Sequence, residues 1–347
     1  MQNRNRLISF MQTFGIILVV LGHSTYQLMQ AGHTPAIYKW IYTFHMPLFF
    51  FISGYLLRYS NDRKGRQLSD MPALGKDGFI TKKIKRLLIP YFVISSLVFI
   101  PKTMMSAMAL RPVDMSVWSY LGMLLYPQTN VIGYFWFLPT LFMIFCLALL
   151  ASRIKVRVND ILLLAALIAV NLTVPDIALI GLGDAIYNSI FFAAGYVVCK
   201  YKLENMVGRH AAVTATVTFI ISIALLRLPE GDIRFLVSSF NGILMVIAAA
   251  HIYTGKKLHF LDHIDGASYT IYLLSWFPQV ASQQILMALI PNIPWQITTT
   301  LAFFSGLYVP LLIYKWLIAH KDRTSCRYIM VVLGIQSTPN RNKPETK

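Results

Sequence analysis

The chain has 347 residues, of which 56% are hydrophobic and only 13% are charged. Soluble domains contain roughly 25% charged residues, so the composition excludes a soluble globular protein and predicts an all-α integral membrane protein. The formal net charge of +17 needs its own explanation, because basic loops of a membrane protein and a nucleic-acid-binding surface both produce such an excess.

Windows of about 20 apolar residues predict about ten transmembrane helices. In chain order, these segments cover residues 7–28, 40–59, 87–108, 133–151, 160–175, 185–199, 211–227, 235–254, 268–290 and 296–319. Residues 1–320 would form a single polytopic membrane domain. Residues 321–347 would form a basic cytoplasmic tail that we expect to be partly disordered, from about Gln336.

The distribution of Lys and Arg predicts that both termini are cytoplasmic. With that orientation, all but five of the 31 basic residues lie on the cytoplasmic side, as the positive-inside rule requires. The five on the outer side are Lys39, Lys102, Arg111, Arg227 and Arg234. The excess of positive charge therefore indicates contact with the anionic lipid bilayer, and we expect no nucleic-acid partner.

The acidic residues and the cysteines argue against other functions. Acidic residues avoid the predicted helices almost completely, which argues against a cation-coupled or proton-driven transporter, because such proteins need carboxylates inside the membrane. Cys146, Cys199 and Cys326 lie far apart in the sequence. They show neither metal-ligand spacing nor a disulfide framework, so we predict no metal site.

The first apolar segment contains one ionisable residue, His23, deep in a helix long enough to cross a bilayer. An ionisable residue within a membrane is a candidate for a functional site. Gln12 shares its helical face, ~16 Å away along the axis. Both side chains must face protein or a water-filled cavity, while the apolar remainder can face lipid. The alternative is a secretory signal peptide that begins with Arg4 and Arg6, although no clean cleavage site follows.

The second segment brings another histidine, His45, to a similar depth near the outer side. Pro47 lacks a backbone N–H and clashes with the carbonyl of Thr43. We therefore expect the helix to open beside His45, which would suit a substrate pocket that includes Tyr42. The alternative is that His45 is an interfacial residue in contact with lipid headgroups.

A cluster of basic residues leads into the third predicted helix, namely Lys82, Lys83, Lys85 and Arg86. Such a cluster can neutralise the phosphates of a cytosolic acyl-CoA or nucleotide. It can equally be a positive-inside anchor that binds only lipid headgroups. Arg58, at the cytoplasmic end of the second helix, could extend to the same interface.

Aromatic residues open the fourth predicted helix, where Asn130 is followed by Tyr134 and Trp136. Tyr and Trp at a membrane interface are ordinarily belt residues. Their rings also stack on sugar rings, so this segment is a candidate for binding a carbohydrate substrate.

Five motifs follow one another along most of the chain and resemble those of acyltransferase family 3, a family of integral-membrane O-acyltransferases. They are residues 15–23 (GIILVVLGH), 44–56 (FHMPLFFFISGYL), 85–91 (KRLLIPY), 135–142 (FWFLPTLF) and 268–276 (SYTIYLLSW). Each motif alone is weak, whereas five at this spacing are fairly specific. The resemblance is greatest to the fucose 4-O-acetylase-like branch.

This resemblance implies a membrane O-acyltransferase of the bacterial cytoplasmic membrane. It would move an acetyl group from acetyl-CoA to a hydroxyl of a cell-envelope carbohydrate or lipid-linked glycan, such as O-antigen, capsule or exopolysaccharide. His23 matches the family's catalytic histidine, and the basic cluster matches its donor motif, with Arg58 assigned to the same donor. The residues assigned to the acceptor are Tyr42, Asn130, Tyr134 and Trp136.

Two positions depart from the family pattern. Members usually have Arg or Lys where this chain has Gln12, and much of the wider family has a histidine where this chain has Ser275. His23 would act as a general base on the sugar hydroxyl or form a covalent acyl-histidine, with a neutral imidazole as the resting form. Gln12 would orient the donor and His45 the acceptor. The alternatives are a flippase or exporter for glycan or lipid, and a catalytically impaired family member.

Overall fold

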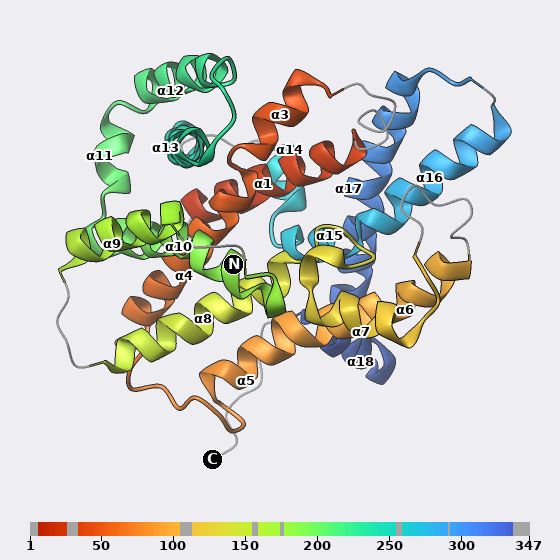
Figure 1. The fold of residues 1–347 in the computed structure, drawn as a ribbon, viewed down its shortest axis with the longest axis horizontal. Coiled ribbons are helices and arrows are strands. Elements are labelled where there is room, and N and C mark those ends of the chain that lie inside the picture. The colour runs from red at the N-terminus through yellow and green to blue at the C-terminus, as the bar shows by residue number, and fades with distance from the viewer. Residues whose placement is uncertain are drawn as a thin grey trace.

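The computed structural model describes residues 6–25, 34–104, 113–154, 159–173, 177–254, 259–290 and 292–335. Within these ranges, all regular secondary structure is helical (Figure 1), which confirms the predicted all-α class. The first half contains α1 (Arg6–Ser24), α3 (Ala36–Tyr42), α4 (His45–Arg63), α5 (Phe79–Lys83), the π-helical turn η1 (Ile84–Leu88), α6 (Ile89–Met104), α7 (Val117–Leu125), α8 (Phe137–Arg153) and α9 (Asp160–Thr173). The second half contains α10 (Leu182–Tyr201), α11 (Glu204–Arg209), α12 (Ala211–Leu225), α13 (Asp232–Thr254), α14 (His259–Ile264), α15 (Ser268–Leu274), α16 (Trp276–Leu289), α17 (Trp295–Ala319) and α18 (Thr324–Val332).

Several stretches of helix are able to cross a membrane. Among the described residues, six are long and apolar enough by length and composition: Arg6–Ser24, Ala36–Arg63, Phe79–Met104, Leu179–Tyr201, Asp232–Thr254 and Trp295–Ala319. α8, α9 and α12 are apolar but shorter. These helices support a multi-pass membrane protein. Each of the ten predicted segments contains a helix, but ten crossings and cytoplasmic termini remain predictions.

The ends of some predicted segments lie outside the described residues. This applies to the extension of the first, third and fifth helices to residues 28, 108 and 175, and to the predicted disorder from about Gln336. The described start of the predicted tail contains α18, which packs against η1 and α6. Cys326 and Met330 of α18 are buried in that contact.

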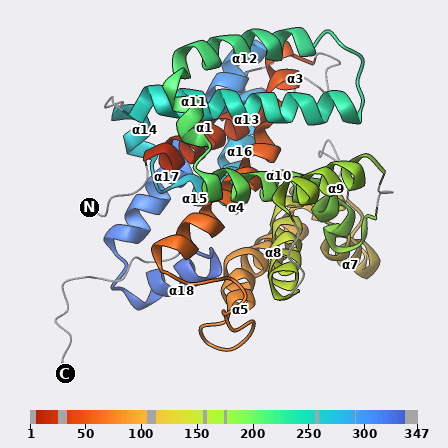
Figure 2. The same cartoon turned by 90° about the vertical axis from the view of Figure 1, so that its left-hand side faces the viewer.

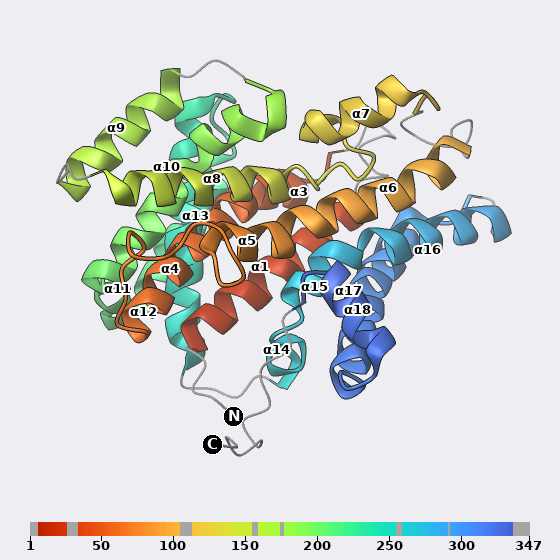
Figure 3. The same cartoon turned by 90° about the horizontal axis from the view of Figure 1, so that it is seen from below.

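α1 lies inside the helix bundle. It contacts α3, α4, α13, α15 and α17, and Figures 1 and 3 show it in red between α13 in teal and α17 in blue. Met11, Ile16 and Val20 of α1 are fully buried. Contrary to the expectation that the apolar surface of this helix faces lipid, much of that surface is covered, because helices from the C-terminal half of the chain pack on it.

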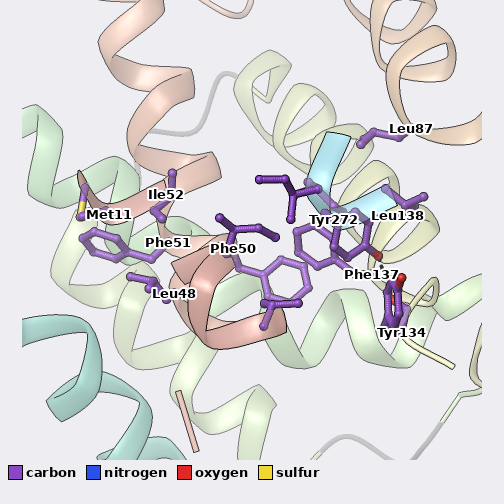
Figure 4. Packing of buried hydrophobic residues seen from close by; sticks show 14 of the residues in the cluster. Met11, Leu48, Phe50, Phe51, Ile52, Leu87, Tyr134, Phe137, Leu138 and Tyr272 are labelled. Carbon is purple, nitrogen blue, oxygen red and sulfur yellow. Dashed lines mark hydrogen bonds between the residues drawn. The ribbon is translucent and has the colours of Figure 1, made fainter. Parts of the chain in front are cut away.

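α4 connects the parts of the bundle that surround α1. It contacts both α13 and α10, and α13 in turn pairs with α12 at the top of Figure 2. Aromatic rings fill the space between α4, α8 and α15. The ring centroid of Phe50 lies 4.9 Å from that of Phe137, which lies 5.6 Å from that of Tyr272. Figure 4 shows these three side chains.

Two glycines bring the backbones of α4 and α10 into direct contact. A Cβ added to Gly54 would lie 1.9 Å from the carbonyl oxygen of Phe192, and one added to Gly195 would lie 2.0 Å from the carbonyl oxygen of Phe51. Small residues allow this approach, and close packing replaces the hydrophobic effect as the main attraction between helices in lipid.

Replacement of either glycine by valine should prevent stable packing of α4 on α10. Overpacking typically costs about 1–3 kcal/mol, and we expect the upper end or more at both glycines, because the obstructing atom belongs to the backbone rather than to a flexible side chain. The measurement is the yield of monodisperse protein and its thermal transition in detergent. Gly122→Val is the matched control, because no atom lies within 4 Å of a Cβ there. Equal yields for Gly195→Val and Gly122→Val would contradict the contact.

Candidate functional site

The helix break predicted from Pro47 is present and places His45. α3 ends at Tyr42 and α4 begins at His45, with a non-helical backbone at Phe44. The carbonyl oxygen of Thr43, which Pro47 deprives of its helical donor, accepts a hydrogen bond of 2.7 Å from Ser239 Oγ of α13. The prediction that the helix opens beside His45 is therefore confirmed, and the carbonyl left open by the break is bound by α13.

His45 is buried, with 3% of its surface exposed. This burial does not fit the alternative that it contacts lipid headgroups. Its Nδ1 lies 2.9 Å from the carbonyl oxygen of Ile41. A carbonyl oxygen can only accept, so Nδ1 carries the proton and donates it, and Nε2 of the neutral ring holds a lone pair.

His23 lies in the last turn of α1 and meets two tyrosines. Its Nδ1 is 3.3 Å from Tyr42 Oη, and its ring centroid is 4.4 Å from that of Tyr134. The ring of Tyr42 also lies 4.6 Å from that of His45. Tyr42 therefore links the two histidines, and we refer to His23, Tyr42, His45 and Tyr134 as the histidine cluster.

Hydrogen bonds fix Tyr134 against the junction between α15 and α16. Its carbonyl oxygen accepts a hydrogen bond of 2.7 Å from Tyr272 Oη, the contact drawn in Figure 4. Its own Oη accepts from the backbone N–H of Trp276 at 3.2 Å and lies 3.5 Å from Ser275 Oγ. Pro278 lacks a backbone donor and so interrupts the helix at this point. Ser275, which departs from the family pattern, thus contacts the cluster through Tyr134.

Two glutamines of α16 bind the turn of α1 that carries His23. Gln279 Nε2 donates to the carbonyl oxygen of Val20 at 2.8 Å, and Gln283 Nε2 donates to that of Ser24 at 3.1 Å. Both glutamines are buried, with 3% and 5% of their surfaces exposed. Neither was predicted from the sequence, although a four-residue spacing of amides in an apolar helix puts both on one face.

Gln12 does not reach the histidine cluster. It is partly buried on α1, and the eleven residues between it and His23 correspond to ~16 Å along the helix axis. On the same helix, Ser9 Oγ and Thr13 Oγ1 are buried without a partner among the described residues. The donor contact proposed for Gln12 is therefore separate from the contacts of His23.

Asn130 and Trp136 make contacts outside the histidine cluster. Asn130 is buried, donates to Ser95 Oγ at 2.8 Å and accepts from the backbone N–H of Ile132 at 2.9 Å. These bonds fasten the segment before α8 to α6. The ring of Trp136 lies 6.2 Å from that of Phe50. A role of either residue in acceptor binding remains a prediction.

The predicted basic cluster occupies the π-helical turn η1 and its approaches. Pro90 cannot donate to the carbonyl oxygen of Arg86, and Tyr269 Oη donates to that oxygen instead. The guanidinium of Arg86 lies over the ring of Tyr269, 5.2 Å from its centroid. Such π-turns are frequent at functional sites.

The lysines of this cluster have different partners. Lys82 Nζ lies 3.2 Å from Asp77 Oδ1, and Lys83 Nζ lies 3.4 Å from the ring centroid of Phe145. Lys85 is exposed. Two of the lysines thus contact other residues of the protein, and a role of the cluster in binding the donor remains a prediction.

Arg58 is bound elsewhere, near the end of α4. Its Nε donates to Asp62 Oδ2 at 2.8 Å and its Nη1 donates to Tyr196 Oη at 3.3 Å.

Within the described ranges, no group of three or more His, Cys, Asp or Glu side chains is placed to hold a metal ion.

One protein-family model matches almost the entire length of the chain. A family model described as an acyltransferase domain matches residues 5–315, which is nearly the whole chain and includes every residue of the histidine cluster. Comparisons with curated proteins and with solved structures gave no match. The chain belongs to acyltransferase family 3.

Proposed function

We propose that this membrane O-acyltransferase moves an acetyl group from acetyl-CoA to a hydroxyl of a cell-envelope carbohydrate, and that His23 is its catalytic residue. Membership of the family supports the acyltransferase activity. The identities of the donor, the acceptor and the site residues are what we propose. The observation that supports the site is the position of His23, whose Nδ1 lies 3.3 Å from Tyr42 Oη beside the buried His45.

The proposed reaction uses His23 as a general base. The acceptor hydroxyl oxygen attacks the thioester carbonyl carbon while its proton passes to Nε2 of His23, the ring nitrogen that does not face Tyr42. The carbon–sulfur bond then breaks, and the proton passes from His23 to the departing thiolate of coenzyme A. General-base catalysis of this kind contributes typically ~10²–10⁴ in rate. A covalent acyl-histidine is the other route open to the same residue.

The neighbours of His23 supply orientation. As a base, His23 would donate its Nδ1 proton to Tyr42 Oη, which fixes the ring with Nε2 toward the substrate. The lone pair on Nε2 of His45 can accept a hydrogen bond from a second hydroxyl of the acceptor. Tyr134 is buried with its ring against that of His23, so it would act on the acceptor by holding His23, and Asn130 and Trp136 would act through the segment that they share with Tyr134.

Gln12 would bind the donor at a distance from the reacting carbon. A separation of ~16 Å along α1 excludes simultaneous contact with a thioester carbonyl beside His23. The amide of Gln12 is instead suited to the amide groups of the pantetheine arm, because it both donates and accepts hydrogen bonds. With Gln12 in place of the family's usual Arg or Lys, this position has no charge but still offers a hydrogen-bonding partner to the amide groups of pantetheine.

The proposed location is a bacterial cytoplasmic membrane, with both termini in the cytoplasm. It is supported by the positive-inside distribution of basic residues and by the six apolar helices that are long enough to cross a bilayer. The fucose 4-O-acetylase-like branch, and O-antigen, capsule or exopolysaccharide as the acceptor, are part of the same proposal.

Replacement of His23 by alanine should abolish acyl transfer. We expect the release of free coenzyme A thiol from acetyl-CoA, with a mixture of envelope glycans as acceptor, to fall by ~10²–10⁴. The control is His320→Ala, because His320 lies outside the cluster and contacts the carbonyl oxygen and the ring of Trp316 one turn earlier. Unchanged turnover in His23→Ala would contradict the assignment. Absence of turnover in the unmodified protein would favour the catalytically impaired family member.

Removal of a glutamine amide from α16 should slow the reaction by displacing His23. Gln283→Leu keeps the approximate volume but loses the hydrogen bond to Ser24, and Gln279→Leu loses the bond to Val20. A hydrogen bond of this type is worth about 0.5–1.5 kcal/mol, so we expect kcat to fall roughly two- to tenfold with KM for acetyl-CoA unchanged. The neighbouring exposed Gln284→Leu is the control. A change in KM alone would exclude a positioning role.

A further inference from the structure

The C-terminal helix α18 lies beyond the part of the chain that matches the acyltransferase family. The match ends at residue 315, whereas α18 spans Thr324–Val332. It nevertheless packs on η1 and α6, the segment that carries part of the basic cluster. Membership of the family therefore does not account for α18, and its role must follow from its own contacts and surface.

The C-terminal end of α18 rests directly on the backbone of η1. The N–H of Ile335 donates to the carbonyl oxygen of Met330 at 2.8 Å, and that of Gly334 donates to that of Val331 at 3.1 Å. This pair of bonds ends many helices at a glycine in the left-handed conformation, and Gly334 has a φ of +61°. A Cβ on Gly334 would lie 2.6 Å from the carbonyl oxygen of Arg86. The backbone of η1 is thus covered only while α18 stays in place.

The face of α18 that points away from η1 is apolar and exposed. Tyr328, Ile329 and Val331 have 71%, 44% and 56% of their surfaces exposed, whereas Cys326 and Met330 on the inner face are buried. The nine residues of α18 are too few to cross a bilayer, which takes about 20. A short helix with an apolar outer face is suited instead to lie in the interface of a membrane.

The end of α17 brings α18 to a membrane surface. α17 is one of the helices long and apolar enough to cross a membrane, and residues 320–323 alone join it to α18. Trp316, in the last turn of α17, is 50% exposed, and tryptophan is enriched where a helix meets the headgroups. α18 therefore begins within a few residues of the headgroup layer, on the cytoplasmic side in the proposed orientation.

The charges beside the apolar face favour anionic lipid. Lys321, Arg323 and Arg327 outnumber Asp322, the single acidic residue between α17 and Gly334. Arg323 and Arg327 are exposed, and in the described part of the chain neither forms an ion pair. Their four-residue spacing puts both on one side of the helix. Arginine side chains can extend to headgroups while their stems lie along apolar surface.

We propose that α18 binds the anionic headgroups of the cytoplasmic leaflet through Arg323 and Arg327, with Tyr328, Ile329 and Val331 inserted among the lipids, and in this position keeps η1 covered. The partner is a lipid of the phosphatidylglycerol type. This role goes beyond the proposed reaction and takes from the proposed function only the cytoplasmic orientation of this end. It makes the packing of η1 depend on the lipid composition of the membrane.

The test is the accessibility of residue 328 in the full-length protein held in lipid nanodiscs. Tyr328→Cys is treated with a neutral polyethylene-glycol maleimide, and modification should be at least about tenfold slower with phosphatidylglycerol present than in phosphatidylcholine alone. Arg323→Gln and Arg327→Gln, added to this variant, should each recover about fivefold of the rate, as expected for one basic residue near an anionic surface. Gln67→Cys, an exposed neutral position in the loop after α4, is the matched control. The native cysteines are buried or partly buried, so the unmodified protein supplies the background rate.

A second measurement follows η1 itself. Hydrogen–deuterium exchange of the backbone amides of residues 84–88 should be several-fold faster in the Arg323→Gln/Arg327→Gln variant than in the unmodified protein in phosphatidylglycerol nanodiscs, and equal in phosphatidylcholine. Gly334→Ala should raise the exchange in both lipids, because its Cβ meets the carbonyl oxygen of Arg86 without a change of charge.

Three results would overturn the role of α18. The first is an equal rate of modification of Tyr328→Cys in the two lipids. The second is slow modification that is already present in detergent and disappears on dilution, which would identify a second copy of the chain over this face. The third is unchanged exchange of residues 84–88 in the double arginine variant. None of these measurements uses acyl transfer, so failure of the proposed function would be detected separately.

Discussion

Inside a bilayer, a backbone carbonyl that loses its helical donor has no water to bind, and this constraint determines how the helices of this protein are joined. Pro47 frees the carbonyl of Thr43, which binds Ser239 of α13. In the more exposed turn η1, where water could also bind, Pro90 frees the carbonyl of Arg86, which binds Tyr269 of α15. At each interruption, the freed carbonyl oxygen thus accepts a hydrogen bond from a helix that is distant in sequence. The irregular parts of the helices therefore hold the bundle together.

The same constraint gathers polar side chains around the end of α1. The last carbonyls of a helix have no intrahelical donor, and Gln283 supplies one to Ser24. Gln279 donates to the carbonyl oxygen of Val20, one turn earlier in α1. A Cβ on Gly306 of α17 would lie 2.5 Å from the side chain of Gln279, so the absence of a side chain at Gly306 leaves room for Gln279. A histidine in this turn is therefore surrounded by groups whose positions are already determined by backbone hydrogen bonds.

Features that depend on a single helix could be predicted from the sequence, and features that depend on packing could not. The break at Pro47 and the similar depth of His23 and His45 follow from local geometry. Ser239 is 196 residues from its partner Thr43, and no periodicity relates the two. The positive charge of the basic cluster was visible, but the pairing of Lys82 with Asp77 and the contact of Lys83 with the ring of Phe145 depend on how the loop after α4 and α8 fold around these two lysines.

The interior position of α1 has a consequence for biogenesis. It is the first of the described helices to leave the ribosome, yet its neighbours α13, α15 and α17 lie more than 200 residues later in the chain. At synthesis rates of about 5–20 residues per second, tens of seconds or less pass between the synthesis of His23 and that of α16, whose Gln279 and Gln283 bind the turn that carries it. During that time, His23 must be shielded by α3 and α4 or by the insertion machinery, and the candidate site is completed only when the C-terminal helices are inserted.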